Sequence, residues 1–144
     1  PMKCVIVYHS SHHGNTKKLV EAIAQGRDVT LIDAAATKSA DLSGYDRIGF
    51  ASGIYFGKFH TSVLEFARNN LSHGKQVFFL STYGGSSNTK AIEQVVKEKS
   101  AQIIGQYGCR GYDTFGPFQL IGGIAKGHPN ETDLENAKRF FETL

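Results

Sequence analysis

Small hydroxyl-bearing residues and glycine follow the first apolar run of the chain. The run Lys3–Tyr8 reads KCVIVY, the loop His9-Ser10-Ser11-His12-His13-Gly14-Asn15-Thr16 comes next, and residues with helical spacing follow. A loop between a buried strand and a helix start presents free backbone N–H groups where the helix dipole favours an anion. The loop therefore predicts a phosphate site formed by Ser10, Ser11, His12, His13, Gly14, Asn15 and Thr16. An ordinary capped turn has the same composition, and both interpretations stay open.

Two later loops combine aromatic residues with glycine. SGIYFGKFH follows the strand expected at Arg47–Ala51, and STYGGSSN follows the strand expected at Gln76–Leu80. Aromatic rings in glycine-flanked loops can stack on a flat heterocycle while backbone groups bind its polar edge. The candidate ligand-binding residues are Gly53, Ile54, Tyr55, Phe56, Gly57, Ser81, Thr82, Tyr83, Gly84 and Gly85. The three aromatic residues are equally compatible with inward packing on the core.

The elements that must position these loops alternate along the chain. Strands are expected at Lys3–Tyr8, Asp28–Ile32, Arg47–Ala51, Gln76–Leu80 and Gln102–Cys109. Helices are expected at residues 15–25, around 63–71, around 92–96 and from a capping box at Thr132-Asp133-Leu134-Glu135 onward. Parallel strands need long right-handed connections, so the pattern predicts an α/β fold: a doubly wound, three-layer domain with a five-stranded parallel sheet. Ligands bind such sheets beyond the carboxyl ends of the strands.

Composition limits the possible functions. The chain has 144 residues, 40% of them hydrophobic and 20% charged, with a net charge of +3, and one domain over residues 1–144 is expected. Its scattered Lys and Arg residues do not predict a nucleic-acid partner. No apolar run is long enough for membrane insertion, and the first residues lack a signal-peptide layout, so a cytoplasmic location is expected. Cys4 and Cys109 form no CxxC pair, which predicts buried thiols and no metal site.

The run VIVYHSSHHGNTKKLVEAIA resembles the opening of flavodoxins, whose phosphate loop reads roughly [TS]-x-T-G-x-T. Gly14, Asn15 and Thr16 match the end of that motif, and Ser10 and Ser11 match its start, whereas His12 and His13 occupy a stretch one residue longer. The loop at 52–60 is also similar to that of flavodoxin-like protoporphyrinogen oxidases. The resemblance implies strand order 2-1-3-4-5, FMN as a non-covalent cofactor, and an isoalloxazine held between the loops at 53–57 and 81–85.

The resemblance implies two functions. One is electron transfer by FMN to a redox partner protein or a small-molecule electron acceptor, and the alternative is an FMN-dependent oxidoreductase acting on a quinone or porphyrinogen-type substrate. No acid–base pair is evident, so no catalytic residue is assigned and the electron carrier is favoured. Carrier flavodoxins are typically acidic, whereas this chain is mildly basic, which keeps the enzyme interpretation open. The irregular stretch 110–131 indicates either a functional loop or undetected structure.

Overall fold

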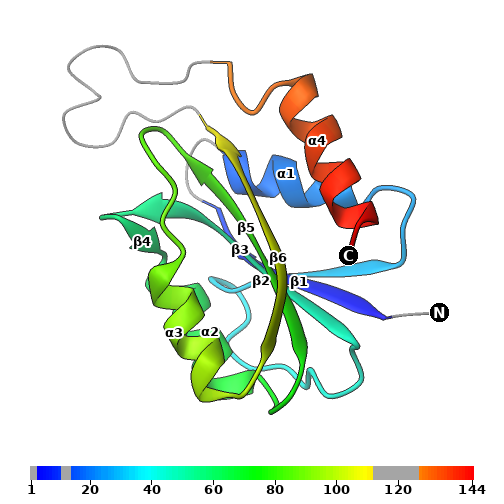
Figure 1. Cartoon of the computed structure of the whole chain (residues 1–144), viewed down its shortest axis with the longest axis vertical. Coiled ribbons are helices and arrows are strands. Elements are labelled where there is room, and N and C mark those ends of the chain that lie inside the picture. Colours follow the sequence, from blue (N-terminus) through cyan, green and yellow to red (C-terminus); the bar gives the residue numbers. More distant parts are fainter. Residues whose placement is uncertain (1–2, 11–13, 112–126) are drawn as a thin grey trace.

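The structure of the chain, a computed structural model, describes residues 3–10, 14–111 and 127–144. Within these ranges, five parallel strands form a sheet in the order β2-β1-β3-β5-β6 (Figure 1). Their bounds are β1 Cys4–His9, β2 Val29–Asp33, β3 Arg47–Tyr55, β5 Gln76–Tyr83 and β6 Gln102–Arg110. A short sixth strand, β4 (Lys58–Phe59), pairs antiparallel with the end of β3. The predicted strand order is confirmed, and β4 is the addition.

In the described part of the chain, four helices cover the two faces of this sheet. α1 (Asn15–Ala24) and α4 (Glu131–Glu142) lie on one face, and α2 (Thr61–Asn70) and α3 (Lys90–Glu98) lie on the other (Figure 1). Side chains of a strand alternate between faces, so Val5 and Val7 of β1 pack under α2 and α3 while Ile6 packs under α1. All three are fully buried. The apolar run KCVIVY is therefore a strand covered on both sides, as a doubly wound fold requires.

The third strand is longer than the sequence pattern indicates. β3 continues from Arg47 to Tyr55, and residues 56–57 turn the chain back into β4. Phe56 has φ 51° and Gly57 has φ 77°, which is the two-residue hairpin turn with both φ values positive. Asn or Asp usually occupies the first of these positions, because a bulky side chain is strained there. The sequence pattern therefore did not predict the hairpin, because Phe56 is an unusual residue at this position.

The start of α4 also differs from the prediction. The capping residue is Asn130, not Thr132, because the Asn130 side chain accepts from the Asp133 backbone N–H at 2.9 Å. The Asp133 carboxylate accepts in return from the Asn130 N–H at 2.8 Å. The predicted capping box thus exists two residues earlier, with Asn and Asp in place of Thr and Glu. A second acceptor contact joins the Asp133 carboxylate to His128 Nδ1 at 2.6 Å.

Removing the cap should destabilise the protein. We expect Asn130→Ala to lower the free energy of unfolding by about 1 kcal/mol, because the Asp133 N–H loses its acceptor. Thr132→Ala is the matched control: Thr132 is exposed within the first turn, so its replacement should change stability by less than about 0.5 kcal/mol. Urea unfolding of the two variants measures both values. Equal losses in both variants would contradict the assignment of the cap.

Both cysteines are free and buried, as predicted. Burial raises the pKa of the Cys4 and Cys109 thiols to about 12, so neither thiol readily forms a thiolate.

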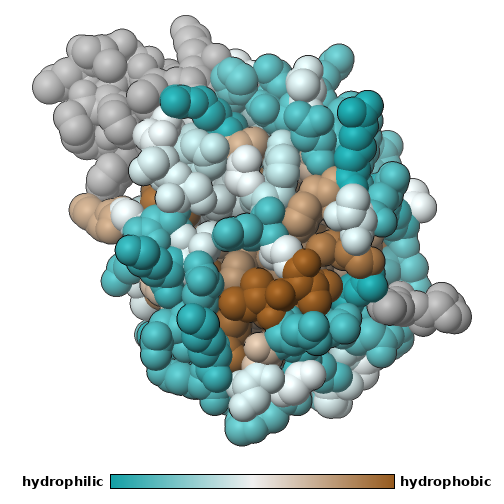
Figure 2. Space-filling view, in the orientation of Figure 1, coloured by the Kyte–Doolittle hydropathy of each residue, from teal (hydrophilic) through white to brown (hydrophobic). Residues whose placement is uncertain are grey.

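None of the helices in the described ranges is long and apolar enough to cross a membrane. Figure 2 shows an apolar patch over the outer strand β6. Ile103, a residue of this strand, is 37% exposed. Most of the predicted irregular stretch, residues 112–126, lies outside the described residues.

Candidate functional site

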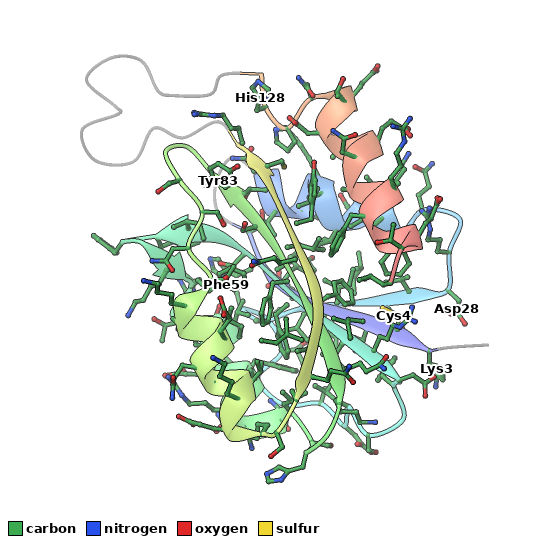
Figure 3. All side chains as sticks on the ribbon, in the orientation of Figure 1. Lys3, Cys4, Asp28, Phe59, Tyr83 and His128 are labelled. Atoms are coloured by element: carbon green, nitrogen blue, oxygen red, sulfur yellow. The ribbon has the colours of Figure 1, made fainter. Side chains whose placement is uncertain are left out.

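The loops after β1, β3 and β5 meet at one edge of the sheet. These three strands are adjacent and parallel, so their carboxyl ends lie side by side. Tyr83 marks this edge in Figure 3, and Lys3 and Asp28, which precede β1 and β2, lie at the opposite edge. The three candidate loops therefore form one site region, which we call the carboxyl edge.

The first loop brings the start of α1 to the carboxyl edge. Gly14 has φ 66°, a left-handed conformation that glycine adopts without strain, and α1 begins at the next residue. The Lys17 backbone N–H donates to Ser10 Oγ at 3.2 Å, which ties the two ends of the loop together. Of the residues predicted to bind the phosphate, the structure describes Ser10, Gly14, Asn15 and Thr16. Ser11, His12 and His13 lie outside the described residues.

A pair of buried hydroxyls joins α1 to β5. Thr16 Oγ1 lies 2.9 Å from Thr82 Oγ1, and the two residues are 2% and 4% exposed. The end of β6 also reaches this point, because the Gly111 N–H donates to the Tyr83 carbonyl at 2.9 Å. A Cβ atom at Gly111 would lie 2.6 Å from Asn15 Nδ2, so a larger residue there would displace the start of α1. The first loop and the loop after β5 are thus held together.

The hairpin after β3 presents an aromatic residue at its tip. Phe56 is 85% exposed despite its left-handed backbone, and Gly57 beside it is exposed too. Ile54 packs against the core under α2, and Tyr55 turns back over Gly53. A Cβ atom at Gly53 would lie 3.1 Å from the Tyr55 hydroxyl. A strained, exposed aromatic residue is unfavourable for an isolated domain, and such outliers concentrate at functional sites.

β5 continues past its predicted end at Leu80 to Tyr83, so Ser81 and Thr82 are strand residues that point to opposite faces of the sheet. Ser81 Oγ lies 2.8 Å from Ser87 Oγ on the α3 side, whereas Thr82 faces α1. The buried Gly84 carbonyl accepts from Arg110 Nη1 at 2.7 Å, which fixes the loop to β6, and Gly85 is exposed. The hydroxyls of Ser81 and Thr82 therefore hold the loop in place through protein partners.

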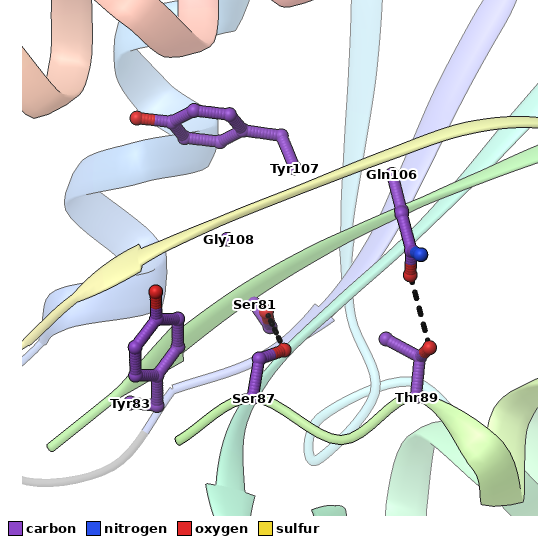
Figure 4. A pocket seen from close by; sticks show the side chains of 7 residues that line it. All are labelled: Ser81, Tyr83, Ser87, Thr89, Gln106, Tyr107 and Gly108. Atoms are coloured by element: carbon purple, nitrogen blue, oxygen red, sulfur yellow. Dashed lines mark hydrogen bonds between the residues drawn. The ribbon is translucent and has the colours of Figure 1, made fainter. Parts of the chain in front are cut away.

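A pocket of about 290 Å³ lies between this loop and β6 (Figure 4). Its lining side chains are all uncharged polar or aromatic groups. Gly108 contributes no side chain, and a Cβ atom at this position would lie 2.6 Å from Ser81 Oγ. Thr89 Oγ1 and Gln106 Oε1 lie 2.9 Å apart across one end. The lining residues are Ser81, Tyr83, Ser87, Thr89, Gln106, Tyr107 and Gly108.

Two histidines that the sequence analysis left out of the site lie stacked at the carboxyl edge. The rings of His9 and His60 are parallel within 3°, with centroids 3.6 Å apart. The Tyr55 ring meets both of them edge-on, at 5.7 and 5.2 Å. His60 also caps α2, because its Nδ1 accepts from the Ser62 backbone N–H at 3.1 Å. Histidine is not a usual cap, so only the adjacency of β1 and β3 in the predicted order could have brought these residues together.

The surroundings of the two imidazoles disfavour protonation. Burial is the main cause that lowers the pKa of both rings below the ordinary 6.5. For His9, the neighbouring His60 lowers the pKa further, Asp33 acts in the opposite direction, and Lys38 lowers it slightly. Lys38 has the same effect on the pKa of His60. Both rings are therefore mainly neutral at pH 7.

Acidification should consequently weaken the fold. Unfolded histidines take up protons near pH 6.5, while His9 and His60 in the folded chain do so at lower pH. Between those values the unfolded state binds more protons, so stability is fully present above about pH 6.5 and falls as the pH drops toward the folded pKa. His9→Gln should reduce this loss between pH 7 and pH 5, as measured by urea unfolding. His73→Gln, at an exposed position in the loop after α2, should retain the wild-type slope.

The donor set of the carboxyl edge suits a phosphorylated flat heterocycle. A helix start after a left-handed glycine offers backbone N–H groups to an anion, with hydroxyls close by. The exposed Phe56 ring and the half-buried Tyr55 and Tyr83 rings offer faces for stacking. The loops thus offer oriented dipoles and aromatic faces, and the side chains of Lys17, Lys18 and Lys58 lie in or beside them.

The chain is similar to known proteins along almost its whole length. Residues 6–114 match the flavodoxin domain family. An uncharacterised protein of Methanocaldococcus jannaschii is 38% identical, over 99% of this chain and 98% of its own length. Flavodoxin 1 from Bacillus cereus superposes with a TM-score of 0.70 at 16% identity, covering 99% of both chains. Rubredoxin oxygen:oxidoreductase from Desulfovibrio gigas superposes with a TM-score of 0.68 at 14% identity, covering 99% of this chain and 35% of its own.

Proposed function

Because the chain belongs to the flavodoxin domain family, we propose that it is an electron-transfer flavoprotein that binds FMN non-covalently at the carboxyl edge. The observation that carries the proposal is the hairpin tip, where a strained backbone holds Phe56 exposed at the carboxyl edge. Bound FMN would supply the redox chemistry, and the protein would bind it, orient it and exclude water from it.

Each loop has a separate task in this proposal. The backbone of residues 14–16, with Ser10 and the adjoining residues 11–13, would bind the phosphate at the start of α1. Tyr55 and Phe56 would cover one face of the isoalloxazine, and Tyr83 with the backbone of Gly84 and Gly85 would lie at the other face and the polar edge. Thr16, Ser81 and Thr82 would act mainly by holding these loops in position.

The charge of the chain does not decide between carrier and enzyme, but for a carrier it predicts an acidic partner. The net charge of +3 would steer association toward acidic surfaces or anionic acceptors, and this attraction would weaken with salt. The alternative, an FMN-dependent oxidoreductase acting on a quinone or porphyrinogen-type substrate, shares the same cofactor site. The two functions differ in whether the reduced protein passes its electrons to a separate redox partner or acceptor, or itself catalyses turnover of a specific substrate.

Stepwise reduction of the flavin-loaded protein tests the proposal. The purified chain should be yellow or take up added FMN, with a shift in the visible flavin spectrum. A carrier would show little turnover with NAD(P)H or quinones alone, whereas rapid two-electron turnover with a quinone would establish the enzyme instead. A colourless protein that does not change the spectrum or fluorescence of added FMN would refute the proposal.

The exposed ring at the hairpin tip gives a more specific expectation. Phe56→Ala should raise the Kd for FMN about three- to tenfold, because an aromatic stacking contact contributes about 0.5–1.5 kcal/mol. Ile103→Ala is a suitable control, since Ile103 is also an exposed apolar residue but lies on β6 away from the three loops. Fluorescence titration with FMN measures both constants. An unchanged Kd in the Phe56 variant would remove this ring from the site.

A further inference from the structure

Ser62 joins the two stacked imidazoles at the carboxyl edge. Its hydroxyl oxygen lies 3.1 Å from His9 Nδ1 and 2.9 Å from His60 Nδ1. Its backbone N–H also contacts the His60 nitrogen, at 3.1 Å. The two Nδ1 atoms therefore converge on one residue, and each ring directs its Nε2 atom away from it.

These contacts determine which nitrogen of each neutral ring carries the proton. A backbone N–H can only donate, so His60 Nδ1 is an acceptor and its proton resides on Nε2. His60 Nδ1 therefore has no proton to donate to the Ser62 hydroxyl, so the hydroxyl must donate its single proton to His60 Nδ1. The Ser62 oxygen is then an acceptor toward His9, and His9 Nδ1 must carry the N–H. His9 Nε2 is consequently the bare, basic nitrogen.

The two rings thus differ in role although they are stacked face to face. His9 presents a proton acceptor at Nε2, and His60 presents a proton donor there. His9 is the last residue of β1 and directly precedes Ser10 of the first loop, and its ring touches Tyr55 of the hairpin. The basic nitrogen therefore belongs to a residue at the junction of two candidate FMN loops.

We propose that His9 is the proton-exchanging residue of this site, with Ser62 and His60 as positioning residues that hold its Nδ1 proton in place. The proposal rests on the proposed flavin function. When the ring is protonated, Nε2 also carries a proton. On reduction of a bound flavin, or of an electron acceptor beside it, the external reductant would supply the electrons, and the Nε2–H bond would break as one N–H or O–H bond forms on the reduced group. His9 would then be neutral with its proton on Nδ1, and on reoxidation its bare Nε2 would accept the released proton and pass it to water.

The charges around His9 set the direction of this exchange. Asp33 at the end of β2 favours the protonated ring, whereas burial, the stacked His60 and Lys38 in the segment after β2 oppose it. Tyr55 and Ser62 contact the pair as neutral groups. Because the pKa of His9 is lowered below 6.5, His9 is mainly a proton acceptor at pH 7 and becomes a donor as the pH falls.

Nitrogen NMR of the chain without flavin tests the positioning. In ¹⁵N-labelled protein at pH 8, His9 should carry its proton on Nδ1 and His60 on Nε2. Ser62→Ala should abolish the Nδ1 preference of His9, and Ser62→Thr, which retains the hydroxyl, should restore it. A His9 ring that carries its proton on Nε2 in the wild-type protein would overturn the proposal whether or not the chain binds flavin.

Rapid reduction of the FMN-loaded protein tests the exchange itself. With dithionite as reductant, the wild-type rate should exceed the His9→Gln rate by about tenfold or more at pH 6, and the ratio should approach one at pH 8. His73→Gln should match the wild type at both pH values. A chain that binds no FMN refutes the proposed function and with it the redox role of His9. A pH-independent ratio in a chain that does bind FMN refutes the role of His9 alone.

Discussion

Replacement of Gly14 by valine should raise the Kd for FMN by about tenfold or more. Gly14 has φ 66°, and a residue with a side chain is disfavoured there by about 1–2 kcal/mol. Valine is worse than most, because it is branched at Cβ. The backbone would rotate out of the left-handed region and turn the first N–H groups of α1 away from the phosphate. A loss of 1.4 kcal/mol corresponds to about a tenfold change in Kd.

Gly26→Val is the matched control for this prediction. Gly26 follows the end of α1, has φ 73°, and like Gly14 has open space where a Cβ atom would be. Both substitutions should therefore lower the free energy of unfolding by similar amounts, but only Gly14→Val should weaken FMN binding. Urea unfolding and FMN titration separate the two effects. Equal FMN affinities of the two variants would place the phosphate elsewhere.

Phe79→Ala should remove about 3–5 kcal/mol of stability. Phe79 lies in the middle of β5, is fully buried, and meets the Phe59 ring edge-on at a centroid distance of 6.3 Å. Truncation removes the transfer free energy of the ring and leaves a cavity in the core beneath α2 and α3. Urea unfolding in the absence of FMN measures the loss. A value below about 1 kcal/mol would mean that the core collapses to fill the cavity.

Truncation of the phenylalanine at the hairpin tip should have the opposite pattern of effects: FMN binding should weaken and stability should be retained. Phe56 is 85% exposed, so Phe56→Ala should change the free energy of unfolding by less than about 0.5 kcal/mol while weakening FMN binding. Phe79 precedes Ser81 by two residues, but its ring is fully buried in the core under α2 and α3, so the folded variant should retain its FMN affinity. The two variants together separate fold from site.

The sheet could be predicted from sequence because its signals are local. Apolar runs such as KCVIVY alternate with helical spacing, and parallel strands leave few ways to connect them. The strand order around β1, β3 and β5 came from the resemblance to flavodoxins, and with it the edge where the three loops meet. The signal that ends the first helix is likewise local, since Gly26 adopts the left-handed conformation that is usual for glycine after a helix.

The details that were missed depend on contacts distant in sequence or on unusual residues. The hairpin was missed because Phe56 occupies a position that usually favours Asn or Gly. The cap of α4 was misplaced because Asn130 and Asp133 form the same reciprocal pair as the expected Thr and Glu. The stack of His9 on His60 joins residues far apart in the chain and has no pattern that a single sequence shows.

The buried hydroxyl pair of Thr16 and Thr82 has a consequence for how a ligand is recognised. Because the pair connects the start of α1 to the end of β5, ordering one of these loops restricts the motion of the other. A ligand group bound at one loop therefore reduces the entropy lost when a second group binds at the other, and this coupling is reciprocal. Phosphate and ring would then be recognised cooperatively, so a flavin without its phosphate would lose more affinity than the phosphate contacts alone contribute.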